Sequence, residues 1–261
     1  MDDPAAERPA EQGVAQQLTA QPRARQLRAG PPRVAPIAGW WHTGVVLATL
    51  TATTLYEALR MQKIRAGMST LPSHIVGYSR SSILEWAFLG FILLGVWLHS
   101  APLATVMGPR WKSVREVFEN FGTALAFWFG SVIVLLLVRT LLWRLPNGHA
   151  ARFLLPHGRC ETILWIVLSI SAGICEEAIF RGYLQRQFLA MTQSTPAAIG
   201  MTSLAFGAVH AYQGLKGMIT IGCLGLMLGV LAHRRGTVRI GMIAHAWQDA
   251  FAGLIGTLSR H

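Results

Sequence analysis

The chain has 261 residues, of which 52% are hydrophobic and only 13% charged, whereas soluble domains carry roughly 25% charged residues. This deficit, with several apolar runs of about 20 residues, excludes an ordinary soluble domain and predicts an all-α, polytopic transmembrane helical bundle of about seven spans. The net charge of +11 does not indicate nucleic-acid binding, because the basic residues flank the apolar runs and form no single basic face.

The N-terminal residues 1–36 are polar and rich in Pro, Gln and Arg. They contain too few large apolar side chains to offset the entropy lost on ordering, so we expect a disordered tail. Because this polar stretch precedes the first apolar run, it does not resemble a cleaved secretory signal. We therefore expect a protein retained in the membrane.

The front half, residues 37–150, contains three apolar runs that predict spans at residues 37–59, 83–98 and 121–143. Residues 100–120 mix basic and acidic side chains and predict an amphipathic segment at the membrane surface. Glu85 lies near the start of the second run, and we interpret it as a solvated end residue.

The back half, residues 151–261, contains four further apolar runs, at residues 161–180, 196–210, 217–232 and 238–258. The second and third of these are rich in small residues, which permit close helix packing. Gly225 and Gly229 form a G-x-x-x-G pattern, which we interpret as a close packing surface only.

Ionisable side chains lie within or directly beside these back-half runs. The candidate site residues among them are Glu176, Glu177, Arg181, His210, His245 and Asp249. An ionised group at bilayer depth costs several kcal/mol, so it persists only beside a partner or a water-filled cavity. In a helix Glu177 and Arg181 are spaced i,i+4 and can pair, whereas Glu176 points about 100° away. One glutamate therefore has a built-in counter-ion and its neighbour does not.

Each polar feature taken alone has a structural explanation. His210 could cap a helix, His245 and Asp249 could form a local pair, and the Glu177–Arg181 pair could be structural only. Together they match the needs of hydrolysis: a carboxylate that takes a proton from water, imidazoles that relay protons, and a cation that holds the carboxylates. The sequence contains neither G-x-S-x-G nor H-E-x-x-H.

Three motifs carry a family resemblance: E-E-x-x-x-R ending at Arg181, F-x-x-x-H from Phe206 to His210, and H-x-x-x-D from His245 to Asp249. They resemble the signature of the CPBP intramembrane metalloproteases, which include the type II CAAX prenyl endopeptidases and the bacterial abortive-infection homologues. The resemblance covers about residues 155–258. It implies that residues 151–261 form a catalytic helical core that hydrolyses peptide bonds.

The resemblance also implies roles. Glu176 would activate the attacking water with help from His210, while Glu177 and Arg181 would orient the site. His245 and Asp249 would bind the developing oxyanion or help to hold a divalent metal such as zinc, for which the expected ligands are Glu176, His210, His245 and Asp249. The prenyl endopeptidases carry Asn where this chain has Asp249. A carboxylate donates no hydrogen bond unless protonated, so Asp249 better suits orienting His245 or binding a metal.

Other function classes remain open on the same residues. One is a non-catalytic membrane scaffold or immunity protein of the same fold. Another is a small proton-relaying transporter, which the confinement of charged groups to one half disfavours. The expected partners are membrane lipids and a peptide or protein substrate, with no nucleic acid, and the expected location is a bacterial cell membrane crossed several times.

Overall fold

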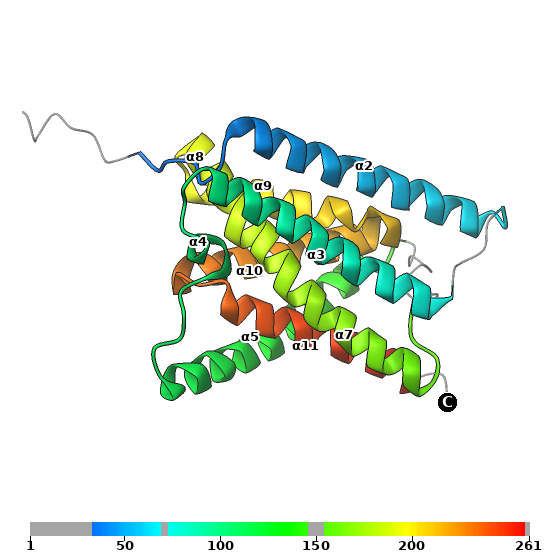
Figure 1. Ribbon diagram of the computed structural model, residues 1–261. Helices are drawn as coiled ribbons and strands as arrows, with labels where there is room; N and C mark the ends of the chain where they lie inside the picture. Colours follow the sequence, from blue (N-terminus) through cyan, green and yellow to red (C-terminus); the bar gives the residue numbers. More distant parts are fainter. Residues whose placement is uncertain (1–32, 69–72, 146–153, 259–261) are drawn as a thin grey trace, which may run out of the picture. The chain divides into compact units, whose positions relative to one another are not determined.

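The computed structural model describes residues 33–68, 73–145 and 154–258, and within these ranges it contains helices and no strand (Figure 1). The chain divides into Met1–Val34 and Ala35–His261, and every helix given below belongs to the second unit. The all-α prediction is confirmed. The predicted tail, residues 1–36, lies almost entirely outside the described residues.

The front half forms α2 (Trp40–Arg65), α3 (His74–Leu98), α4 (Ala104–Met107) and α5 (Val114–Leu141). Ser73 and Ser113 begin α3 and α5, because each serine hydroxyl accepts a hydrogen bond from a backbone N–H of the first turn. The predicted surface segment, residues 100–120, is therefore divided between α4 and the first two turns of α5.

The back half forms one long helix with a π-helical middle section, here called the broken helix, three further α-helices and one short 3-10 helix. Its elements are α7 (Gly158–Glu177), the π-helical η1 (Ala178–Leu184), α8 (Gln185–Thr192), α9 (Thr195–Val209), the short 3-10 helix η2 (Ala211–Gln213), α10 (Leu215–Arg235) and α11 (Arg239–Leu258). No turn interrupts α7, η1 and α8, so they continue one another.

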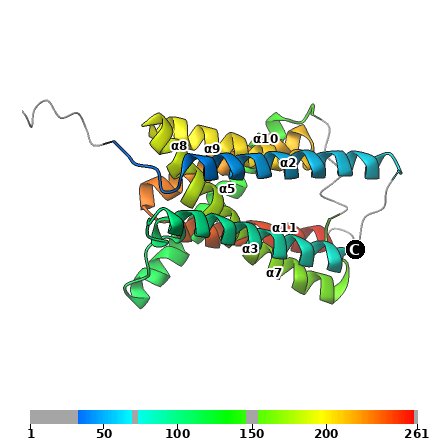
Figure 2. The same cartoon turned by 45° about the horizontal axis from the view of Figure 1, so that its top comes forward.

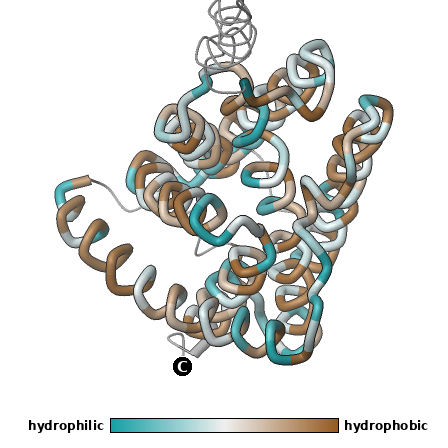
Figure 3. Tube along the Cα trace, turned by 90° about the vertical axis from the view of Figure 1, so that its left-hand side faces the viewer, coloured by the Kyte–Doolittle hydropathy of each residue, from teal (hydrophilic) through white to brown (hydrophobic). Residues whose placement is uncertain are grey.

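Helices that are long and apolar enough to cross a membrane confirm an integral membrane protein. Among the described residues there are four: His74–Leu98, Val114–Leu141, Gly158–Thr192 and Leu215–Arg235. The other three predicted spans also form helices, but α9 has only 15 residues, and α2 and α11 are not among the four. Hydrophobic residues run along the helices (Figure 3). Many large ones are exposed, as on α5, where Leu141 is 81% exposed, and such a surface suits lipid.

The helix α7 joins the back half of the chain to the front half. It packs against α3 and α11, beside which it lies in both ribbon views (Figures 1 and 2). The approach to α11 is close because Gly173 faces it: a Cβ on Gly173 would lie 2.7 Å from the carbonyl oxygen of Met242. Gly207 plays the same part between α9 and α10, where a Cβ would lie 2.8 Å from the carbonyl oxygen of Met218. The small residues therefore allow close packing, as predicted.

A buried polar network joins the start of α2 to η1 and α8. The side chain of Gln187, which is 0% exposed, accepts a hydrogen bond from the backbone N–H of Ile37 and donates one to the carbonyl of Ala38. One turn earlier, the hydroxyl of Tyr183 lies 2.7 Å from Nδ1 of His42. The N-terminal end of α2 is thus fixed to the broken helix through hydrogen bonds.

Candidate active site

A fully buried ion pair supports the candidate site. Nη1 of Arg181 donates to Oε1 of Glu177 at 2.6 Å, and both side chains are 0% exposed. Nη2 of Arg181 donates to the carbonyl oxygen of Gly225 on α10 at 3.0 Å, and the guanidinium lies 4.3 Å from the ring centroid of Phe206. The predicted i,i+4 contact between Glu177 and Arg181 is therefore present.

His245 of α11 links this ion pair to two further carboxylates. Its Nδ1 lies 3.1 Å from Oε1 of Glu177, and its Nε2 lies 3.8 Å from Oε2 of Glu176 and 3.5 Å from Oδ2 of Asp249. Because Glu177 holds one ring nitrogen, the other is turned toward Glu176 and Asp249. The side chains of these two acids are 20% and 38% exposed, although Oε2 of Glu176, the oxygen nearest the ring, is buried without a hydrogen-bond partner among the described residues.

His210 follows α9 and joins the same group of side chains. Its Nδ1 lies 2.9 Å from the backbone carbonyl oxygen of Phe206, which leaves Nε2 to act elsewhere. Its imidazole interacts electrostatically with Glu176. Phe206 is 0% exposed and lies between the two histidines, with ring centroids 5.1 Å from His210 and 5.8 Å from His245. Phe206 therefore packs beside the polar groups.

Glu85 belongs to this neighbourhood, and its interpretation as a solvated end residue is wrong. The helix α3 begins at His74, three turns earlier, so Glu85 lies well inside the helix. Its Oε2 is buried without a hydrogen-bond partner among the described residues, and its carboxyl group interacts electrostatically with Glu176, Asp249 and His245. Ser73 was the sequence signal that could have corrected this interpretation, because its side chain caps α3 and so places the helix start well before the apolar run.

Tyr212 is a second residue that sequence reasoning did not single out. It lies in η2, with its ring centroid 5.9 Å from that of His210, and it interacts electrostatically with Glu176 and Asp249. Burial raises the pKa of the Tyr212 hydroxyl above its ordinary value, so the hydroxyl stays protonated at neutral pH and can donate a hydrogen bond. No motif or spacing marked this tyrosine.

The ligand set expected for a divalent metal at this site is only partly assembled. His245 faces the carboxylates of Glu176 and Asp249, but these residues and His210 do not form a group in which three ligand atoms all approach one another within 4.8 Å. In the part of the chain that the structure describes, the group that meets this condition lies elsewhere, at His74, His157 and Glu161.

Comparison with known families gives a match within the back half. A family model described as "Type II CAAX prenyl endopeptidase Rce1-like" matches residues 159–251. The match runs from the first turn of α7 into α11 and includes each of the six predicted site residues. It does not include α2, α3 or α5. Searches of curated proteins and of solved structures found no match.

Proposed function

We propose that the protein is an intramembrane endopeptidase that hydrolyses peptide bonds with an activated water, because residues 159–251 match the type II CAAX prenyl endopeptidase Rce1-like family model. The convergence of Glu176, His210 and His245 around Phe206 supports the proposal most directly. These residues come from separate helices, and hydrolysis needs such groups to meet at one point.

Glu176 is the proposed general base. It is the member of the glutamate pair without an arginine partner, and its side chain is partly accessible. It accepts a proton from a water molecule, which Nε2 of His210 holds in place. The water oxygen attacks the carbonyl carbon of the scissile bond. Glu176 then passes the proton to the amide nitrogen, and the carbon–nitrogen bond breaks to release the amine.

His245 is the proposed oxyanion donor. A proton on Nε2 forms a hydrogen bond to the negatively charged oxygen of the tetrahedral intermediate, and the nearby carboxylate of Asp249 favours that proton. Glu177 positions the ring through Nδ1, and Arg181 holds Glu177. The ligand geometry does not favour a metal here, so each proton transfer is assigned to a protein group.

The first test uses a farnesylated CAAX peptide, the kind of substrate that the family's name describes, with full-length protein in detergent micelles. We expect wild type to cleave it, and Glu176→Gln and His210→Ala to lower kcat/KM by about 10²–10⁴-fold, the contribution of a positioned general base. Glu119→Gln is the matched control, because Glu119 is an exposed glutamate of α5 paired with Arg115. Full activity of both site variants would contradict the assigned roles.

A substrate without a prenyl group calls for a second measurement. The proteomes of membranes that contain wild type or Glu176→Gln are compared, and we expect an uncut protein to accumulate with the variant. The non-catalytic scaffold makes the opposite prediction, since a scaffold tolerates Glu176→Ala in a complementation assay. Identical proteomes together with full complementation by Glu176→Ala would exclude the endopeptidase.

A further inference from the structure

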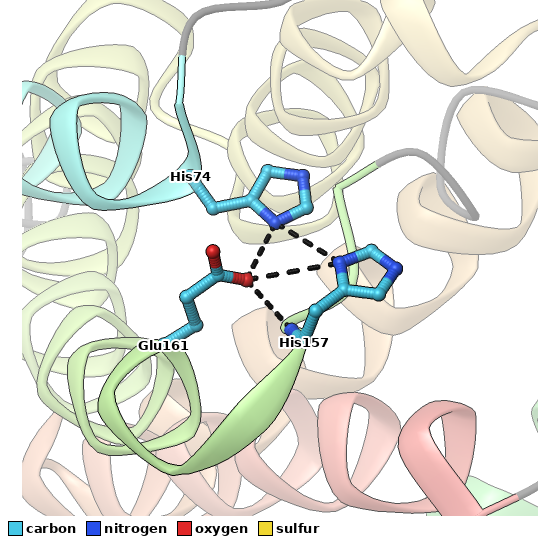
Figure 4. A group of neighbouring side chains, drawn as sticks. All are labelled: His74, His157 and Glu161. Atoms are coloured by element: carbon cyan, nitrogen blue, oxygen red, sulfur yellow. Dashed lines mark hydrogen bonds and ion pairs between the residues drawn. The ribbon is translucent and has the colours of Figure 1, made fainter.

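A second group of potential ligands lies at the N-terminal ends of α3 and α7. His74 is the first residue of α3, His157 precedes α7, and Glu161 lies in the first turn of α7. Figure 4 shows both imidazole rings turning a nitrogen toward the same carboxylate oxygen. The proposed hydrolysis uses none of these residues. Glu161 is about 22 Å from Glu176 along the axis of α7, at about 1.5 Å per residue.

The three ligand atoms form a triangle of the size that a metal ion requires. Nδ1 of His74 lies 2.8 Å from Oε2 of Glu161 and 3.3 Å from Nδ1 of His157, and the remaining edge, from Nδ1 of His157 to that oxygen, is 3.7 Å. Bonds of about 2.0–2.1 Å from nitrogen or oxygen to a tetrahedral zinc place neighbouring ligand atoms roughly 3.3 Å apart. The edge at 2.8 Å must lengthen and the edge at 3.7 Å must shorten, each by roughly 0.5 Å or less, to reach this spacing, so small side-chain movements would complete the triangle.

The surroundings hold these ligands in position. The backbone N–H of His157 donates to Oε2 of Glu161 at 2.7 Å, and a carboxylate oxygen can accept this bond while it binds a metal through its other lone pair. The hydroxyl of Tyr78 on α3 donates to the carbonyl of Leu154, which ties the segment before α7 to α3. The side chain of His157 is 57% exposed, so an ion can enter from solvent.

From this geometry we propose that His74, His157 and Glu161 form a binding site for a divalent cation of the zinc type, which joins the N-terminal ends of α3 and α7. Two imidazoles and one carboxylate are a ligand set that zinc takes, with water completing the coordination. The site does not depend on the proposed endopeptidase activity. It braces the two helices that carry Glu85 and Glu176.

The test measures zinc bound to full-length protein in detergent micelles after chelator treatment and reloading. We expect one zinc per chain by elemental analysis, and Co²⁺ in its place should give the visible absorption of a tetrahedral site. His157→Gln and Glu161→Gln should each lose the zinc and the cobalt spectrum. The affinity should fall by more than the 10–100-fold that follows loss of an outer-shell partner.

Three control variants distinguish zinc binding at this site from zinc binding elsewhere in the protein. His99→Gln removes an exposed histidine at the opposite end of α3 and should keep one zinc. Glu176→Gln and His245→Gln should also keep it, because they change only the candidate active site. Helical content by circular dichroism confirms that each variant is folded. The proposal is overturned if wild type binds no zinc, if folded His157→Gln and Glu161→Gln retain it, or if the loss follows Glu176 and His245 instead.

Discussion

Glu176 and Glu177 are adjacent in the chain but have different environments. Glu177 is fully buried, with Arg181 at 2.6 Å and His245 at 3.1 Å, whereas the side chain of Glu176 is 20% exposed. The i,i+4 spacing predicted which of the two would pair, because only one glutamate lies on the helix face of Arg181. The contact from His245 to Glu177 was not predictable, since it joins residues on different helices. These buried polar contacts fix Glu177 in place and leave Glu176 as the proposed general base.

Removal of Arg181 tests the buried pair. Arg181→Leu leaves the carboxylate of Glu177 without its cation, so we expect a loss of about 3–5 kcal/mol in unfolding free energy. Arg181→Lys should also be destabilising, because a lysine cannot reproduce the forked contacts with Glu177 and Gly225. Thermal unfolding in detergent micelles, followed by circular dichroism, measures both effects.

The chain supplies a matched control for this measurement. Arg115 and Glu119 form another i,i+4 pair at 2.7 Å, but their side chains are 87% and 55% exposed. Solvent screens such a pair, so Arg115→Leu should leave the unfolding midpoint unchanged. Equal effects of the two substitutions would show that burial does not decide the strength of the Glu177–Arg181 pair.

At the scale of helices, side-chain hydrogen-bond donors on the broken helix meet backbone carbonyl oxygens of α10. Arg181 of η1 and Gln185 of α8 donate side-chain hydrogen bonds to the carbonyl oxygens of Gly225 and Gly229. The G-x-x-x-G pattern is thus more than a close packing surface, because it lets polar side chains reach the backbone of α10. The π-helical geometry of η1 begins directly after Glu177, and π-helical turns are frequent at functional sites. The sequence predicted helix here but gave no sign of this change in winding.

An added methyl group on α10 tests that arrangement. The Cβ of Gly225→Ala would lie 3.1 Å from the ring of Phe206 and 3.3 Å from Nη2 of Arg181. We expect overpacking to cost about 1–3 kcal/mol and cleavage to slow, because both contacted groups support the site. Gly222→Ala is the control in the same helix, where the nearest atom is at 3.6 Å and alanine should stabilise by up to about 1 kcal/mol. Similar stability and cleavage in the two variants would argue against a tight fit at Gly225.

At the scale of the whole chain, the fold and most of the polar cluster could be predicted, but the contribution of the front half could not. Apolar runs indicate helices because length and composition are local properties, and the three motifs indicated which side chains meet. Glu85 lies outside the motifs, and its proximity to His245 depends on how α3 packs against α7. Periodicity contains no information about such packing.

Glu85 therefore provides a test of whether the front half contributes to the site. Glu85→Leu removes a buried carboxyl oxygen that has no hydrogen-bond partner among the described residues, so we expect the unfolding midpoint to rise. We also expect kcat/KM for the peptide to fall by about tenfold or more, because a polar group that interacts with Glu176 and His245 is lost. Unchanged cleavage by a stabilised Glu85→Leu would limit the active site to the back half.

The hydrogen bonds from Gln187 to the chain before α2 have a practical consequence for protein engineering. Gln187 binds the backbone of both Ile37 and Ala38, so we expect a change in the chain just ahead of these residues to disturb the broken helix that carries Arg181. We expect an affinity tag or reporter fused directly before residue 37 to weaken the hydrogen bonds between Gln187 and this backbone. A long soluble spacer between the fused tag and residue 37 would keep the tag from distorting the candidate active site.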